Sequence, residues 1–210
     1  VGVVYGRQIG NEQTRFSEHQ IFLQWFPPVS NFRQQTPFCN NANCAIRRSL
    51  WLEQRYDENL TGLEDLDWAK KIQRKGWKVA YDAEAVIVHV HEESYAKIRR
   101  RYQREAIAMK AILPEVHVNL WDFVRLFLLS TISDYFAAIR QGRFFKELFD
   151  IPSFRLMQYY GTYQGHRQHG ELTREIRNRF YYPGSGSKKV LKHEKLGNRE
   201  SRKIEYPEFD

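Results

Sequence analysis

The sequence has few of the residues that mark a secreted, disulfide-linked protein. Its 210 residues include only two cysteines, Cys39 and Cys44, which lie close together in the chain. Two thiols in one short segment cannot form a disulfide framework, so the chain suits a reducing compartment. The opening residues, VGVVYGRQI, also lack the charged start and apolar core of a signal peptide. Because the first residue is not Met and the opening looks like the middle of a sheet, we expect a chain cut at its N-terminus.

Long apolar runs and internal repeats are missing as well. Between residues 120 and 149 the chain is strongly aromatic and aliphatic, but its uncharged run extends only from Leu126 to Ser133. A membrane-spanning helix needs roughly 20 such residues. We therefore predict no transmembrane helix, and expect helices that lie at a membrane interface or cover the core.

Acidic residues are outnumbered by basic ones. The chain has 33 Lys and Arg against 25 Asp and Glu, a net charge of +8, and 42% of its residues are hydrophobic. The apolar content can fill a sizeable core. The positive charge suits an anionic partner, which could be nucleic acid, a phospholipid surface or a phosphorylated substrate.

Apolar patterns and turn residues alternate through the first half of the chain. They predict strands at 1–5, 79–81 and 85–90, a loop entering a strand at 38–47, and helices at 17–26, 49–53, 64–74 and 94–113. This order predicts an α/β fold. We divide the chain into an α/β part, 1–115, a helical and possible membrane-associating extension, 116–182, and a charged tail, 183–210, that we expect to be disordered.

Residues 62–91 contain the most informative pattern. Glu64 and Asp65 open the helix at 64–74, and His89 and His91 end the next strand. Alternation along a strand places the two histidines on one face. In parallel α/β sheets, sites form beyond the carboxyl ends of strands, and neutral imidazole is a common metal ligand.

Each of these pairs also has a purely structural interpretation. Acids in a first helical turn stabilise the helix dipole, and the histidines could be a hydrogen-bonded strand end. A zinc site is less favoured, because no third ligand is nearby and the cysteines form no CxxC pair.

The segments FCNNANCAIRRSLW and YDENLTGLEDLDWAKKIQRKGWKVAYDAEAVIVHVHEESYAKIRRRYQREA resemble the C-terminal half of the catalytic domain of bacterial family 2 glycosyltransferases, and most resemble its rhamnosyltransferase-like members. VGVVYGRQI is similar to the segment after the family's metal-binding DxD motif. The resemblance covers residues 1–112. It implies a truncated GT-A fold, the fold of nucleotide-diphospho-sugar transferases: a mixed sheet, here followed by a C-terminal helical extension.

The resemblance assigns roles to particular residues. It makes Asp65 the catalytic base, Glu64 a residue that orients the acceptor or the base, and His89 a ligand to Mg²⁺ or Mn²⁺, with His91 as second choice. Further substrate-binding candidates follow from the same likeness or from the basic helix after the histidines: Asn41, Asn43, Cys44, Trp68, Arg99 and Arg101. Trp68 is equally open to a role in the core, and the arginines to a solvated helix face.

The resemblance implies inverting transfer of a sugar, such as rhamnose, from a nucleotide-diphosphate donor. The implied acceptor is lipid-linked or a polysaccharide in cell-surface glycan synthesis, and the implied location is the cytoplasmic face of the plasma membrane, against anionic lipid and without nucleic acid. The triplet Asp65-Leu66-Asp67 has the letters of a DxD motif, but it is the tail of the ED motif on a helix, so the family's metal-binding DxD is missing from these residues. We therefore expect these residues alone to lack half of the donor site and to be inactive without an N-terminal half.

Two other functions remain open at this stage. Stretches such as RRRYQR and RNRFYY would suit a non-catalytic module that binds RNA or anionic lipid through phosphate contacts and stacking, although no known RNA-binding motif is present. A metal-dependent hydrolase could use the same acids and histidines.

Overall fold

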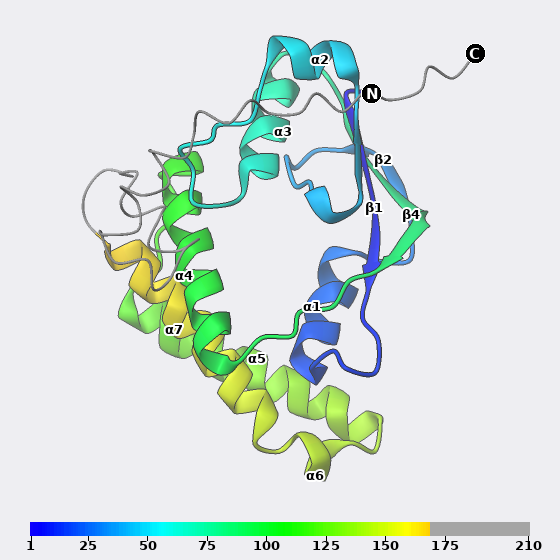
Figure 1. Ribbon diagram of the computed structural model, residues 1–210. Helices are drawn as coiled ribbons and strands as arrows, with labels where there is room; N and C mark the ends of the chain where they lie inside the picture. Colours follow the sequence, from blue (N-terminus) through cyan, green and yellow to red (C-terminus); the bar gives the residue numbers. More distant parts are fainter. Residues whose placement is uncertain (169–210) are drawn as a thin grey trace, which may run out of the picture.

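The computed structural model describes residues 1–168, and these residues form an α/β structure with one small mixed sheet (Figure 1). The sheet has four strands in the order β2-β4-β1-β3. Their bounds are β1 Val3–Ile9, β2 Asn31–Gln34, β3 Cys44–Ile46 and β4 Val79–Val88. The α/β prediction is confirmed, while the predictions for 169–182 and for the tail 183–210 fall outside the described residues.

The helices follow the predicted order closely. They are α1 Phe16–Trp25, α2 Arg48–Glu53, α3 Glu64–Arg74, α4 Tyr95–Ile112, α5 Leu120–Arg140, α6 Phe144–Glu147 and α7 Asp150–Arg167, with a 3-10 turn, η1, at Asn41–Asn43. The prediction at 64–74 is confirmed at both ends, and Gly76 adopts the positive φ of 84° that ends a helix there. Strand β2 was not predicted, and the two strands predicted between 79 and 90 are the single strand β4.

The strands β1 and β4 run parallel, so their carboxyl ends lie at the same edge of the sheet. The ladder is interrupted where Gly6 pairs with Asp82 but the next residue, Arg7, pairs with Val86. A Cβ atom on Gly6 would lie 2.1 Å from the side-chain nitrogen of Asn43 and 2.2 Å from the carbonyl oxygen of Ala85. Glycine is therefore needed where η1 crosses the bulge between β1 and β4.

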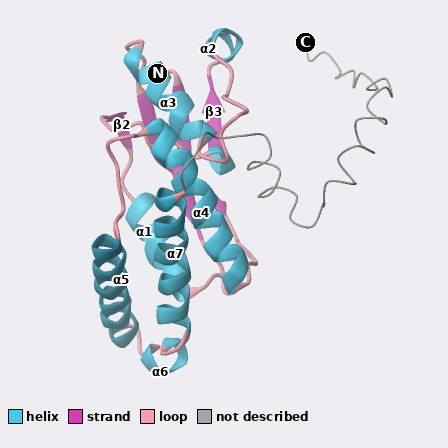
Figure 2. Ribbon diagram, turned by 90° about the vertical axis from the view of Figure 1, so that its left-hand side faces the viewer, coloured by secondary structure: helices cyan, strands magenta, loops and turns pink. Residues whose placement is uncertain are grey.

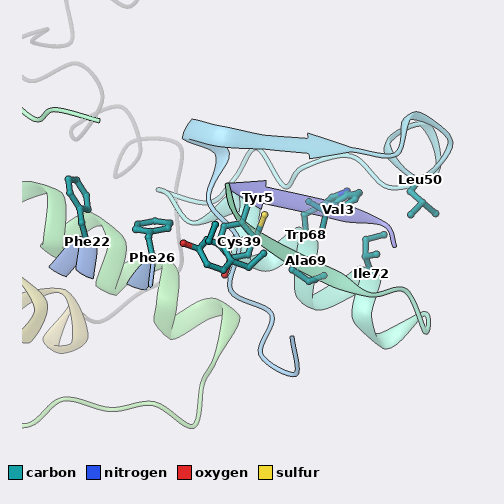
Figure 3. Close-up of a cluster of buried hydrophobic side chains, with 12 residues drawn as sticks. Val3, Tyr5, Phe22, Phe26, Cys39, Leu50, Trp68, Ala69 and Ile72 are labelled. Atoms are coloured by element: carbon teal, nitrogen blue, oxygen red, sulfur yellow. The ribbon is translucent and has the colours of Figure 1, made fainter. Parts of the chain in front are cut away.

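Helix α3 covers one face of the sheet and forms the main core. Trp68, Ala69 and Ile72 recur at helical spacing and are fully buried. Figure 3 shows them gathered against Val3 and Tyr5 of β1. This packing fixes the direction of α3, and with it the position of the helix start that carries the acids.

The helical extension packs on the α/β part through close helix contacts. Helix α7 lies against α4 on one side and α5 on the other (Figure 2). Gly161 and Gly165 allow this approach. A Cβ on Gly161 would lie 2.3 Å from the carbonyl oxygen of Arg99 in α4, and a Cβ on Gly165 would lie 2.5 Å from that of Gln103. In the described residues no helix is long and apolar enough to cross a membrane.

Candidate functional site

The acids Glu64 and Asp65 occupy the first turn of α3, as predicted. The residue before them, Leu63, has a left-handed backbone with φ 56° and ψ 28°. This conformation is unfavourable for a bulky side chain and often occurs at functional sites. The side chain of Leu63 packs on the small apolar cluster that contains Leu66 and Ala108, so tertiary packing holds the strained turn that presents the acids.

Asn41 of η1 holds both carboxylates. Its backbone N–H donates to Asp65 Oδ2 at 2.9 Å, and its side-chain amide donates to Glu64 Oε1 at 3.3 Å. The hydroxyl of Tyr56 donates to Asn41 Oδ1 at 2.6 Å and so fixes the orientation of that amide. Nothing in the sequence marks Tyr56 as part of the site, because it lies in an irregular loop without a periodic pattern.

The surroundings of Asp65 make its carboxylate a better proton acceptor. Burial raises the pKa of the Asp65 carboxyl above its ordinary value of 3.8, and the neighbouring charge of Glu64 acts in the same direction. The backbone N–H donors of Asn41 and Leu66 oppose the shift but do not cancel it. A carboxylate with a raised pKa is what general-base chemistry requires.

The other candidates in this segment connect η1 to the sheet. Asn43 donates from its side-chain nitrogen to the carbonyl oxygen of Ala85 at 2.7 Å, which ties the turn to β4. Cys44 begins β3, and its sulfur lies 3.6 Å from that of Cys39 in the core. Both cysteines are free thiols. These contacts make Asn43 and Cys44 supports for the turn that carries Asn41.

His89 and His91 directly follow β4 and face each other. Their Nε2 atoms lie 2.9 Å apart, which confirms that both point to the same side. Nδ1 of His91 lies 2.8 Å from Oε1 of the buried Glu18 in α1, and the guanidinium of Arg101 donates to the same oxygen at 3.0 Å. A carboxylate behind an imidazole fixes the orientation of the ring. Glu18 was not a candidate in the sequence analysis, since it lies on a helix far away in the chain.

Two substrate-binding candidates are placed differently from the prediction. Trp68 is only 1% exposed, and its indole N–H donates to the carbonyl oxygen of Gln54 at 2.5 Å, so it is a core residue and cannot stack on a sugar. Arg101 pairs with Glu93 at 2.7 Å as well as with Glu18, and its side chain is 15% exposed. It is neither a free phosphate ligand nor part of a solvated face. Arg99 lies on the part of α4 that contacts Gly161, with a half-buried side chain.

The acids and the histidines form two separate clusters, and each is connected to β4. The acid cluster reaches the strand through η1, whose Asn43 contacts Ala85, four residues before His89. In residues 1–168 no hydrogen bond or ion pair joins Asp65 to His89. A pocket of about 260 Å³ lies beside the carboxyl end of β1 and is lined by Gln8, His19 and Phe22 among others, but not by Asp65 or His89.

The histidine pair fits part of a divalent-cation site. Two imidazole nitrogens 2.9 Å apart are close enough to reach one ion, and the Glu18 carboxylate supplies the hydrogen-bond acceptor that metal-bound histidines usually have. Within the described part of the chain, no group of three or more His, Cys, Asp or Glu side chains could hold an ion. The remaining ligands would come from substrate, water or other residues.

Comparisons with models of protein families, with curated proteins and with solved structures give no significant match.

The histidine cluster predicts a loss of stability in acid. Burial and the charge of His91 lower the pKa of His89 below its ordinary value of 6.5. Burial opposes ionisation of Glu18, but its contacts with His91 and Arg101 outweigh this and lower its pKa below 4.5. As the pH falls below about 6.5, the unfolded chain takes up a proton at His89 before the folded chain does. Below about 4.5 the same applies to Glu18, so both groups make the folded state less stable as pH falls.

Urea unfolding measured in steps from about pH 7.5 to 4.5 tests whether the protein becomes less stable as the pH falls. We expect the unfolding free energy to decline through this range, and His89→Gln to flatten the upper part of the decline. His117→Gln is the comparison variant: His117 is exposed and lies outside this cluster, although its charge helps to lower the pKa of His166, so this variant should retain the part of the decline that comes from His89. An identical pH dependence for His89→Gln and the unmodified protein would contradict the assignment.

Proposed function

We propose that the protein is an inverting glycosyltransferase of the GT-A type, with Asp65 as the catalytic base. The observation that carries the proposal is the half-buried Asp65 carboxylate, which has a raised pKa and is held at a helix start by the Asn41 backbone N–H. Support also comes from the mixed sheet, in which η1 joins the helix start to the parallel pair β1 and β4. The substrate would be a nucleotide-diphosphate sugar, such as one carrying rhamnose.

In the proposed reaction the acceptor hydroxyl donates a hydrogen bond to Asp65. As the hydroxyl oxygen attacks the anomeric carbon, its proton moves to the Asp65 carboxylate, and the bond to the diphosphate breaks. The electron pair of that bond leaves with the diphosphate oxygen. A single displacement of this kind inverts the anomeric centre. Asn41 and Glu64 keep the base in position throughout, since Asn41 contacts both carboxylates.

The leaving diphosphate needs positive charge nearby. A divalent ion such as Mg²⁺ or Mn²⁺ would supply that charge if bound here. His89 and His91 would hold this ion, oriented by Glu18 behind His91. Arg101 is engaged in ion pairs and serves to hold Glu18 in place.

The proposed acceptor is lipid-linked or a polysaccharide in cell-surface glycan synthesis, reached by a protein bound to the inner face of the plasma membrane. The engagement of Arg101 removes one cation from the basic helix face on which an RNA-binding function would depend. We therefore favour sugar transfer over the RNA-binding module.

A thermal shift measurement with nucleotide sugars tests donor binding. It uses the full-length protein. With Mn²⁺ and a matching nucleotide sugar at about 100 times its Kd, we expect stabilisation by about 2.7 kcal/mol. His89→Ala should remove the Mn²⁺-dependent part of the shift, whereas His117→Ala should retain it. Stabilisation by RNA oligonucleotides and by none of a panel of nucleotide sugars would reject the proposal.

A further inference from the structure

We infer that the outer face of α5 docks on an anionic lipid bilayer. This outer face consists of Trp121, Leu128, Ile132, Phe136 and Ile139, which are 71%, 49%, 50%, 61% and 56% exposed. Scattered exposed apolar residues are normal on a protein surface, but a continuous apolar patch marks an interaction site.

The spacing of these residues makes them one stripe. They follow each other by seven, four, four and three positions, which brings them to one side of a helix. The opposite side of α5 is occupied, since Ser130 contacts Tyr159 of α7 at 2.6 Å and the buried Asp134 pairs with Arg155 of α7. Figure 2 shows α5 at the outside of the helical layer, with α7 between it and α4. Its 21 residues would present a stripe about 30 Å long.

The charges on this segment favour an anionic surface. All three acids between residues 120 and 149 already have partners. Asp122 belongs to the capping box of α5, and Asp134 and Glu147 form ion pairs with arginines. The exposed charged residues of the same segment are all basic: Arg125, Arg140 and Lys146. Cations near a bilayer surface each add attraction to anionic headgroups.

The composition of the stripe fits a bilayer interface better than a protein partner. Arg125 lies within the stripe, where its long side chain can bury its stem and extend its charge to the headgroups. Trp121 suits the same depth, since tryptophan is enriched at membrane interfaces. Two further aromatic residues follow α5 near its carboxyl end, Phe145 at 89% and Phe149 at 79% exposure. A helix with this arrangement lies in the plane of the interface with its apolar side in the acyl boundary.

This inference rests on the proposed function, which places the acceptor at a membrane, and deepens it by naming the surface that would bind the membrane. Binding to vesicles is measured without donor or acceptor. Failure of the docking inference would therefore leave the sugar-transfer proposal standing, and the reverse also holds.

Vesicle flotation of the full chain tests the surface. The vesicles are phosphatidylcholine alone, or phosphatidylcholine with phosphatidylglycerol. We expect the protein to float with the anionic vesicles, and the triple variant Ile132→Ser, Phe136→Ser, Ile139→Ser to lose more than about tenfold in affinity. The matched control replaces three exposed apolar residues elsewhere, Val29→Ser, Phe32→Ser and Leu52→Ser, and should float like the unmodified protein.

A charge variant separates the electrostatic part of vesicle binding from the apolar part. Arg125→Gln with Arg140→Gln and Lys146→Gln should reduce binding to anionic vesicles to the level seen with phosphatidylcholine alone. Equal flotation of the α5 triple variant and the unmodified protein would overturn the inference. A second result would also overturn it: the unmodified protein does not float, sedimentation velocity shows a dimer, and the triple variant is a monomer. The face would then be covered by a second copy of the chain.

Discussion

Replacing Asp65 with asparagine is expected to reduce the rate of sugar transfer by about 10²–10⁴-fold, the usual contribution of a positioned general base. Asparagine has nearly the same shape and can still accept the hydrogen bond from the Asn41 backbone N–H through its side-chain oxygen. It cannot take a proton from an acceptor hydroxyl. The loss would therefore fall on turnover rather than on the fold.

The stability of this variant distinguishes a catalytic role from a structural one. Burial raises the pKa of Asp65, which means that the folded state disfavours the charged carboxylate. A neutral asparagine removes that unfavourable term. The amide nitrogen of asparagine would face the backbone N–H of Leu66, which then loses its acceptor. Because these two effects oppose each other, we expect the unfolding free energy of Asp65→Asn to stay within about 1 kcal/mol of that of the unmodified protein, together with its loss of turnover.

The measurement is release of nucleoside diphosphate from a nucleotide sugar by the full-length protein, alongside urea unfolding. Asp67→Asn is the matched control, because Asp67 lies in the same helical turn and its half-buried carboxylate pairs with Lys71 rather than with Asn41. This variant should retain turnover, and asparagine keeps an oxygen that can accept from Lys71. Unchanged turnover in Asp65→Asn would remove the base assignment.

Replacing Asp134 with alanine is expected to lower the unfolding free energy by about 3–5 kcal/mol. Two bonds join Asp134 to Arg155: Nε donates to Oδ2 at 2.7 Å, and a terminal nitrogen donates to Oδ1 at 2.8 Å. The side chains are 3% and 7% exposed. Removing the carboxylate leaves a buried guanidinium without its counter-charge, which costs much more than the pair itself contributes.

Chemical unfolding followed by circular dichroism measures this effect. Asp150→Ala is the comparison variant, because Asp150 pairs with Arg15 and accepts from the hydroxyl of Tyr95 at a more exposed position, and it should cost clearly less than Asp134→Ala. The double variant Asp134→Leu, Arg155→Met should recover much of the loss, since neither charge is then buried alone. Similar losses for Asp134→Ala and Asp150→Ala would show that the buried pair does not hold α5 on α7.

Local patterns in the sequence determined most of the helices and the position of Glu64 and Asp65 at the start of α3. Helix α3 was predictable because apolar residues recur at helical spacing, acids fill its first turn and Gly76 follows it. The common face of His89 and His91 followed from strand alternation alone. Strand β2 was missed because its residues, NFRQ, are mostly exposed and polar, and pairing with β4 makes them a strand.

Only the tertiary structure decided which side chains meet. The sequence placed Trp68 on a helix but could not tell a core residue from a sugar-stacking one, because both lie on the same helical face. Arg101 looked like part of a free basic face, and Asp134 like an interruption of an apolar run, until packing brought Glu18 and Arg155 to them. The hydrogen bond from Asn41 to Asp65 has the same origin. Contacts between residues far apart in the chain leave no periodic pattern, because they depend on how the helices and the sheet pack.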